Sequence, residues 1–274
     1  MTILATLGGT WTMLAFAAAG CSLVMGALWW WATLRKDASS VDVAWDGLLG
    51  LLAPAYAVFG DGEVERRVLI GVMGGVWGLR LAWHLLTDRI LKATEEDGRY
   101  QALRANWGTS ATWKFFIFFQ AQGVLDVLLS VPFLIAATRA GPLGATDAIG
   151  LGVWLVGLCG ESIADAQLAA WRRNPANRGK TCRRGLWRFS RHPNYFCEWL
   201  MWCSYAIVAG GAAPSWAWLC WLAPLAMLFL ILKVTGVPPT EARALRSRGD
   251  DYRAYQRTTS VFFPWFPKPE GAGA

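Results

Sequence analysis

Long apolar stretches alternate with short charged stretches along the whole chain. A helix needs about 20 predominantly apolar residues to cross a hydrocarbon core of about 30 Å. The pattern predicts seven such helices, of which the sixth is the shortest. They cover residues 11–34, 41–59, 68–86, 115–137, 149–170, 195–209 and 216–232. The sequence therefore predicts an all-α, polytopic membrane protein, in which a bundle of seven transmembrane helices forms one integral membrane domain over residues 1–274.

The composition supports this class and excludes several others. Apolar residues make up 55% of the chain and charged residues only 16%, which is too apolar for a soluble domain. The six cysteines lie mostly inside apolar stretches and form no CxxC pair. This pattern indicates neither a disulfide framework nor a zinc site. With only two histidines, His84 and His192, a histidine-rich metal cage is excluded. We expect no metal.

The distribution of Lys and Arg predicts the orientation in the membrane. Of the 26 basic residues, 22 lie in the first, third and fifth loops and the C-terminal tail, and three lie on the opposite side. The positive-inside rule then places the N-terminus outside and the C-terminus in the cytoplasm. We expect a multi-pass protein of the inner (cytoplasmic) membrane that contacts membrane lipids. The net charge of +7 is explained by topology, so no nucleic-acid partner is expected.

Five of the predicted helices carry a pair of polar residues spaced i, i+4. The pairs are Asp42 and Asp46, Arg80 and His84, Gln122 and Asp126, Glu161 and Asp165, and Asn194 and Glu198. This spacing puts both members on one face of a helix. Polar groups inside a membrane are costly and commonly functional, so the five helices are predicted to surround one polar cavity open to the cytoplasm. The alternative is that the pairs form ion pairs that hold the bundle together.

A basic loop precedes the sixth predicted helix. Residues 172–191 contain seven Arg and one Lys, and Pro193 then occupies the favourable first position of a helix. A helix N-terminus surrounded by guanidinium groups is a good receptor for phosphate. The loop therefore predicts a phosphorylated ligand whose remaining parts enter the cavity. The alternative is attraction to anionic lipid headgroups.

Four segments resemble the DUF1295 family, which belongs with the steroid 5α-reductase and sterol reductase membrane enzymes. Residues 190–198, SRHPNYFCE, resemble the family signature SRHPNYxGE. The other three segments follow the family order over residues 35–267. They are DVAW at 42–45, WGLRLA at 77–82 followed by EDGRY at 96–100, and YRAYQRTTS at 252–260 ending in FPW at 263–265.

The resemblance implies a fold, a cofactor and a reaction. The fold is a seven-helix membrane protein that holds NADPH in a cytoplasm-facing cavity. The reaction is the NADPH-dependent reduction of a carbon–carbon double bond conjugated to a ketone, in a steroid-like or other lipid substrate. The implied cofactor-binding residues are Glu161 and Asp165 for ribose and amide, Arg172 for phosphate, Asn194, Tyr195 and Glu198 for nicotinamide, Arg191 and His192 of the signature, and Tyr252 and Tyr255 of the closing tail segment.

The chain departs from the family at two positions. Cys197 stands where the signature has a small glycine, and Trp77 stands near the third-helix tyrosine of the animal steroid reductases. Because tryptophan cannot supply a proton to an enolate, the candidate acids are Asp46, protonated in apolar surroundings, and Tyr100 from the third loop. Arg80 is the third candidate catalytic residue, since a buried guanidinium needs an anionic partner that a ligand can supply.

Two other functions remain open. One is an S-adenosylmethionine-dependent methyltransferase of lipids or isoprenylcysteine, because those membrane enzymes have a similar RHPxY helix start. They usually carry a Glu-Glu pair in the tail, where this chain has Glu241 followed by Ala242. The other is a non-catalytic lipid-binding relative. In every case, residues 240–257 are predicted to form an amphipathic cytoplasmic helix that covers the cofactor site.

Overall fold

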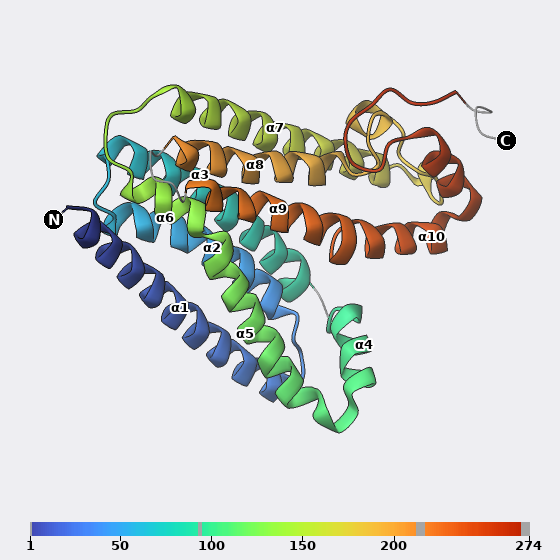
Figure 1. Ribbon diagram of the computed structural model, residues 1–274. Coiled ribbons are helices and arrows are strands. Elements are labelled where there is room, and N and C mark those ends of the chain that lie inside the picture. The colour runs from blue at the N-terminus through green and yellow to red at the C-terminus, as the bar shows by residue number, and fades with distance from the viewer. Residues whose placement is uncertain (1, 93–94, 212–216, 270–274) are drawn as a thin grey trace. The chain divides into compact units, whose positions relative to one another are not determined.

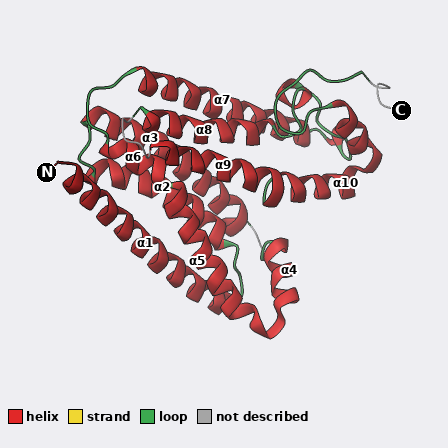
Figure 2. Cartoon of the chain, in the orientation of Figure 1, coloured by secondary structure: helices red, strands yellow, loops and turns green. Residues whose placement is uncertain are grey.

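The computed structural model describes residues 2–92, 95–211 and 217–269, and within these ranges the chain consists of helices and loops (Figure 2). This confirms the all-α class. The ten α-helices of the described ranges are α1 (Thr2–Arg35), α2 (Ser40–Phe59), α3 (Val64–Leu86), α4 (Gly98–Trp107), α5 (Ala111–Leu129), α6 (Val131–Thr138), α7 (Ala145–Arg173), α8 (Pro193–Gly210), α9 (Leu222–Phe229) and α10 (Val237–Thr258).

Six helical stretches of the described residues are long and apolar enough to cross a membrane, where the sequence predicts seven. They are Gly9–Arg35, Ser40–Phe59, Val64–Leu86, Gly98–Thr138, Ala145–Arg173 and Trp218–Thr258. A multi-pass membrane protein is therefore supported, whereas its orientation stays a prediction.

The differences from the predicted spans have local reasons. α8, the sixth predicted span, is not among the six stretches, because Asn194, Glu198 and several aromatic residues lower its hydropathy. The fourth predicted span is interrupted at Ser130, where α5 ends and α6 begins with Pro132 in its first turn. Trp216, the predicted start of the seventh span, lies outside the described residues.

The chain forms two compact units. Unit 1 consists of Met1–Asp147 and Val208–Ala223, and unit 2 of Ala148–Ile207 and Pro224–Ala274. The prediction of one membrane domain over residues 1–274 stays a prediction.

In unit 1, α2 and α3 pack with their backbones in contact (Figure 1). A β-carbon at Gly78 would lie only 2.5 Å from the Cα of Gly50, and one at Gly50 only 2.8 Å from the amide nitrogen of Leu79. Such contacts exclude any side chain at these two glycines. Gly75, one turn before Gly78, has its nearest neighbour at an ordinary 3.7 Å. Gly78 of α3 and Gly50 of α2 thus serve helix packing inside the unit.

Unit 1 also contains a wholly buried ion pair. The guanidinium of Arg66 is 0% exposed and donates from Nε and Nη2 to the two carboxylate oxygens of Asp147, at 2.8 and 3.0 Å. Its three remaining N–H groups donate to the carbonyl oxygens of Arg139, Gly141 and Pro142. All five donors of the guanidinium are therefore used, as a buried arginine requires.

In unit 2, α7 and α8 pack closely along their length. Trp154 Nε1 donates to the hydroxyl of Tyr205 at 3.1 Å. A β-carbon at Gly160 would lie 2.6 Å from Cys197 Sγ. The cysteine that replaces the signature glycine is therefore accommodated by a glycine on the facing helix.

The C-terminal part of unit 2 contains the predicted amphipathic helix, here α10. It starts at Val237, with Pro238 and Pro239 in its first turn, and ends at Thr258, but it is kinked at Gly249, whose φ of +50° is not helical, so the predicted single helix consists of two shorter ones. Eight of its 22 residues are charged, which is too polar for a hydrocarbon core, so any membrane-crossing part of Trp218–Thr258 lies before α10.

Candidate functional site

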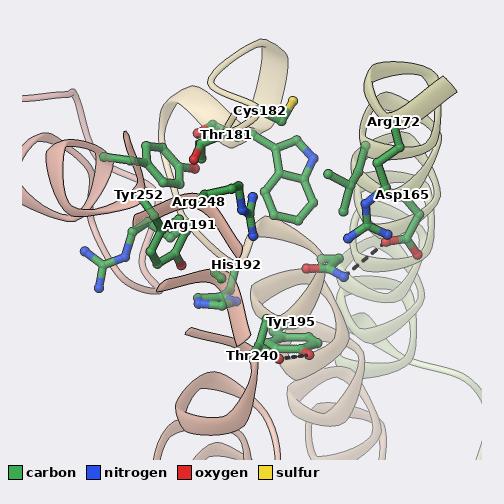
Figure 3. Close-up of a pocket in the computed structure, with 15 residues that line it drawn as sticks. Asp165, Arg172, Thr181, Cys182, Arg191, His192, Tyr195, Thr240, Arg248 and Tyr252 are labelled. Atoms are coloured by element: carbon green, nitrogen blue, oxygen red, sulfur yellow. Dashed lines mark hydrogen bonds between the residues drawn. The ribbon is translucent and has the colours of Figure 1, made fainter. Parts of the chain in front are cut away.

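A cavity of about 220 Å3 lies within unit 2, between α7, the loop after it, the start of α8, and α10 (Figure 3). Its walls carry charged, aromatic and hydroxyl side chains. The lining residues are Asp165, Leu168, Arg172, Thr181, Cys182, Trp187, Arg191, His192, Asn194, Tyr195, Thr240, Ala244, Arg248, Tyr252 and Tyr255.

The basic loop is fastened to α7. Trp187 Nε1 donates to the carbonyl oxygen of Ala164 at 2.8 Å, and the amide of Leu186 donates to Gln167 Oε1 at 2.9 Å. Gly185 has φ of +59°, and a β-carbon there would lie 2.3 Å from Gln167 Oε1, so glycine is required at this turn. These contacts fix the wall that Trp187 contributes to the cavity.

The loop is also fastened to α10. The amide of Thr181 donates to Asp251 Oδ2 at 2.7 Å, and Arg183 donates to the backbone and side-chain oxygens of Asp251. The buried hydroxyl of Tyr255 donates to the carbonyl oxygens of Trp187 and Ser190. Hydrogen bonds therefore join α10 and the loop in one wall of the cavity.

One side of the cavity presents hydrogen-bond acceptors. Asn194 Nδ2 donates to Asp165 Oδ1 at 3.1 Å, which joins α8 to α7 (Figure 3). The hydroxyls of Tyr195 and Thr240 lie 3.1 Å apart. Carboxylate, amide and hydroxyl groups in this arrangement suit a ligand that carries hydroxyl groups of its own.

Glu241 connects the start of α8 to α10 behind the cavity. Its carboxylate accepts from Arg191 Nε at 2.7 Å, Gln256 Nε2 at 2.8 Å and the hydroxyl of Tyr252 at 3.2 Å, and lies 3.3 Å from His192 Nε2. Burial by itself would raise the pKa of Glu241, but the hydrogen bonds from His192, Arg191 and Gln256 outweigh it and lower this pKa from 4.5 to about 2. Glu241 is therefore ionised at neutral pH.

The arginines near the cavity fall into two groups. Arg183 and Arg191 are held by Asp251 and Glu241, respectively, so they stabilise the unit itself. Arg172 and Arg248 line the cavity and form neither a hydrogen bond nor an ion pair with any residue that the structure describes. Arg248 lies over the ring of Tyr252, 5.0 Å from its centroid. Two cations are thus available to a negatively charged ligand.

Eight of the ten predicted cofactor-binding residues lie together in this cavity. They are Asp165, Arg172, Arg191, His192, Asn194, Tyr195, Tyr252 and Tyr255. The other two are not among the lining residues: Glu161 is buried one turn before Asp165 on α7, and Glu198 follows Asn194 by one turn on α8. The structure thus brings eight of the ten residues together, and the role of these residues in binding a cofactor stays a prediction.

The three predicted catalytic residues belong to unit 1. Asp46 and Tyr100 are buried, with 2% and 3% of their surface exposed, and Arg80 lies on α3. The hydroxyl of Tyr100 donates to Asp42 Oδ1 at 2.6 Å, and Arg99 donates to the other oxygen of that carboxylate at the same distance. The hydroxyl of Tyr100, one of the predicted acids, is thus used in a hydrogen bond to Asp42. This hydrogen bond connects α4 to α2.

The five polar pairs are divided between the units. Those of α2, α3 and α5 belong to unit 1, and those of α7 and α8 to unit 2. Their meeting in one cavity therefore stays a prediction.

Sequence reasoning missed several residues of the cavity. Thr240, Ala244 and Arg248 lie on one face of α10, at the spacing of successive helical turns. That spacing is visible in the sequence, but nothing in it distinguishes Arg248 from Arg246, which does not line the cavity. In the sequence, Glu241 stands out only because Ala242 follows it where the methyltransferases usually have a second glutamate.

Comparison with known proteins gives a family and two relatives. Residues 28–259 match a family described as "Protein of unknown function (DUF1295)". An uncharacterized protein of Schizosaccharomyces pombe, C594.04c, is 27% identical over 274 aligned residues, which cover 89% of this chain and 77% of the relative. A protein of Ustilaginoidea virens named "Probable O-methyltransferase ustE" is 32% identical over 94 residues, 31% of this chain and 33% of that protein. No solved structure matches the chain significantly.

Proposed function

Since this chain belongs to the DUF1295 family, whose description assigns no function, we propose that it is a membrane methyltransferase that binds S-adenosylmethionine in the cavity of unit 2. The acceptor is a lipid or another membrane-soluble small molecule. The sequence favours the NADPH-dependent reductase first and this methyltransferase second, and the comparisons reverse that order, because the relative from Ustilaginoidea virens carries a methyltransferase name.

The observation that carries the proposal is the charge pattern of the cavity. The guanidinium groups of Arg172 and Arg248 form no ion pair or hydrogen bond with the described residues, and the wall formed by Asp165 and Asn194 accepts hydrogen bonds. S-adenosylmethionine carries a carboxylate, which suits the two cations, and ribose hydroxyls, which suit the Asp165 carboxylate. The residues present therefore fit this methyl donor.

The residues of the chain have separate tasks in this proposal. S-adenosylmethionine supplies an activated methyl group on a positively charged sulfur. Arg172 and Arg248 hold the carboxylate end of the donor, and Asp165 holds a ribose hydroxyl. The ring of Trp187 and the side chain of Leu168 keep water from part of the cavity. Glu241 and Tyr255 keep the loop and α10 in position around the ligand.

The second candidate is the NADPH-dependent reductase of an enone lipid. Arg172 and Arg248 also suit phosphate groups, and the segment 190–198 resembles the reductase-associated signature. Neither relative described above is named a reductase. The cofactor that binds decides between the two candidates.

The test is a set of parallel calorimetric titrations of the detergent-purified protein with S-adenosylmethionine, NADPH and NADH. We expect S-adenosylmethionine to bind and Arg172→Gln to weaken it about 10-fold, since a charge-assisted hydrogen bond contributes about 1.5–3 kcal/mol and Arg172 is partly screened by solvent. The matched control is Arg173→Gln, which removes the neighbouring charge outside the cavity.

Other outcomes contradict the proposal in different ways. Binding of NADPH alone would favour the reductase function. Binding of none of the three would favour a lipid-binding protein without a cofactor.

A further inference from the structure

His192 occupies a confined position at the cavity wall. Its side chain is almost wholly buried, at 3% exposed, yet the residue lines the cavity. Its ring is stacked on that of Tyr195, with centroids 5.3 Å apart and planes 4° from parallel. Its Nε2 lies 3.3 Å from Glu241 Oε1. Packing on one side and a carboxylate on the other therefore fix the orientation of the imidazole.

The charge of Glu241 decides which ring nitrogen carries the proton. An ionised carboxylate can only accept hydrogen bonds, so the nitrogen that faces it must be protonated. Nε2 of His192 is that nitrogen, and Arg191 and Tyr252 donate to the same oxygen. In the neutral imidazole, Nδ1 then keeps a free lone pair.

Nδ1 has no protein partner. Within the described ranges of the chain, the only side-chain hydrogen bond of His192 is the one between Nε2 and Glu241. A base that is oriented by a carboxylate through one nitrogen, keeps the other without a protein partner and belongs to a residue that lines a cavity is the arrangement that enzymes use to accept a proton from a hydroxyl.

We infer that Nδ1 of His192 accepts the proton of a hydroxyl group on the methyl acceptor, and that the acceptor is therefore an alcohol or a phenol. This inference rests on the proposed function. Methylation joins the hydroxyl oxygen to the methyl carbon, returns the electron pair of the carbon–sulfur bond to sulfur, and releases the hydroxyl proton. Nδ1 takes that proton, and the Glu241 carboxylate stabilises the resulting imidazolium.

The remaining surroundings fit an apolar molecule with one hydroxyl. Leu168, Trp187 and Ala244 contribute apolar surface to the cavity. Glu241, which contacts the ring of His192, also accepts hydrogen bonds from Arg191 and from the hydroxyl of Tyr252. Nδ1 is thus the base placed for a hydroxyl of the acceptor.

The first experiment measures the protonation of the ring directly. The chain has only two histidines, so His84→Gln leaves His192 as the single histidine of the full-length protein. With 15N-labelled histidine, NMR distinguishes protonated from unprotonated ring nitrogens without any methyl donor. We expect neutral His192 to carry its proton on Nε2. A proton on Nδ1 would overturn the inference.

The second experiment uses phenol and anisole as matched probes, because anisole differs from phenol only in having a methyl group in place of the hydroxyl proton. We expect phenol to shift the Nδ1 resonance saturably and anisole to leave it unchanged. Equal responses, or no response to phenol, would overturn the inference. Glu241→Gln, which removes the charge but keeps a side chain of similar size, should give a mixture of the two tautomers.

The outcomes separate this inference from the proposed function. If S-adenosylmethionine binds and Nδ1 is protonated or does not respond to phenol, the methyltransferase stands and the role of His192 is wrong. If Nδ1 responds to phenol and S-adenosylmethionine does not bind, the hydroxyl-binding site stands and the methyltransferase is wrong.

Discussion

In unit 1 the guanidinium of Arg66 is wholly buried and uses all five donors on Asp147 and three carbonyl oxygens. In unit 2 the guanidinium groups of Arg172 and Arg248 line a cavity and make no hydrogen bond or ion pair with the described part of the chain. Arg66 needs these partners because a buried charge without a partner is costly, whereas Arg172 is exposed and Arg248 is half-buried, so solvent hydrates both and a negatively charged ligand can reach them. Unit 1 thus holds a closed network of hydrogen bonds, and unit 2 holds two cations that remain available to a ligand.

The largest effect is expected from Arg66→Ala in unit 1. It leaves the buried carboxylate of Asp147 without its main partner, which should lower the free energy of unfolding by about 3–5 kcal/mol. The loss of stability is measured by heating the protein in detergent and quantifying the folded fraction by size-exclusion chromatography. Glu65→Ala, which changes the exposed neighbour, is the control. Weakened binding of S-adenosylmethionine by the folded fraction of Arg66→Ala would break the comparison.

The next largest effect is expected where α2 and α3 touch. Gly78→Ala forces a β-carbon against the backbone of Gly50 and should cost about 1–3 kcal/mol. Gly75→Ala, on the same helix, meets nothing closer than 3.7 Å and should leave the unfolding temperature unchanged or raise it slightly. The same thermal assay compares them. Equal losses from the two variants would contradict the close packing at Gly78.

A smaller effect, on binding and not on stability, is expected at Arg248 in unit 2. Arg248→Gln should weaken binding of S-adenosylmethionine about 10-fold, or about 1.4 kcal/mol, because it removes one of the two cations available to the carboxylate of the donor. Arg246→Gln removes a charge two residues away that does not line the cavity. Calorimetry compares the two, and an equal loss in both would show that general charge, not the cavity, attracts the ligand.

The smallest effect is expected from acid. Burial raises the pKa of Glu241, but its hydrogen bonds stabilise the ionised form more strongly, so the pKa is lowered from 4.5 to about 2. A lowered pKa means that Glu241 stabilises the fold above pH 4.5 and that this contribution is lost as the pH falls from 4.5 toward 2. Between pH 6 and pH 4 the unfolding temperature should therefore fall less steeply in Glu241→Gln than in the unmodified protein. Parallel curves would contradict this role.

The sequence predicted the helices better than their interruptions. Runs of apolar residues and the proline at position 193 located most spans and the start of α8, because helix length and proline geometry are local properties. The break at Ser130 was missed although Pro132 is a local signal for it, because the apolar run continues on both sides of the break without a change in hydropathy. The two glycines at the contact between α2 and α3 were visible as small residues, but their contact partners were not.

The candidate site was predicted in part, for the same reason. Residues near the basic loop, such as Asp165, Arg172 and Asn194, are close in sequence to the start of α8, and the cavity includes them. Arg248 was missed although residues 240–257 were predicted to cover the site, because nothing in the sequence distinguishes it from Arg246 and only the fold decides which of the two faces the cavity.

By itself the sequence determined that this is a helical membrane protein of the DUF1295 family, with basic residues concentrated before one helix, because hydropathy, charge and local motifs are properties of neighbouring residues. Only the tertiary structure decided which arginines are already paired. Arg191 and Arg172 are indistinguishable in composition, but Arg191 meets Glu241 and Arg172 meets the cavity. Whether a charge stabilises the fold or remains available to a ligand depends on partners that are distant in sequence, and these partners exist only once the chain has folded.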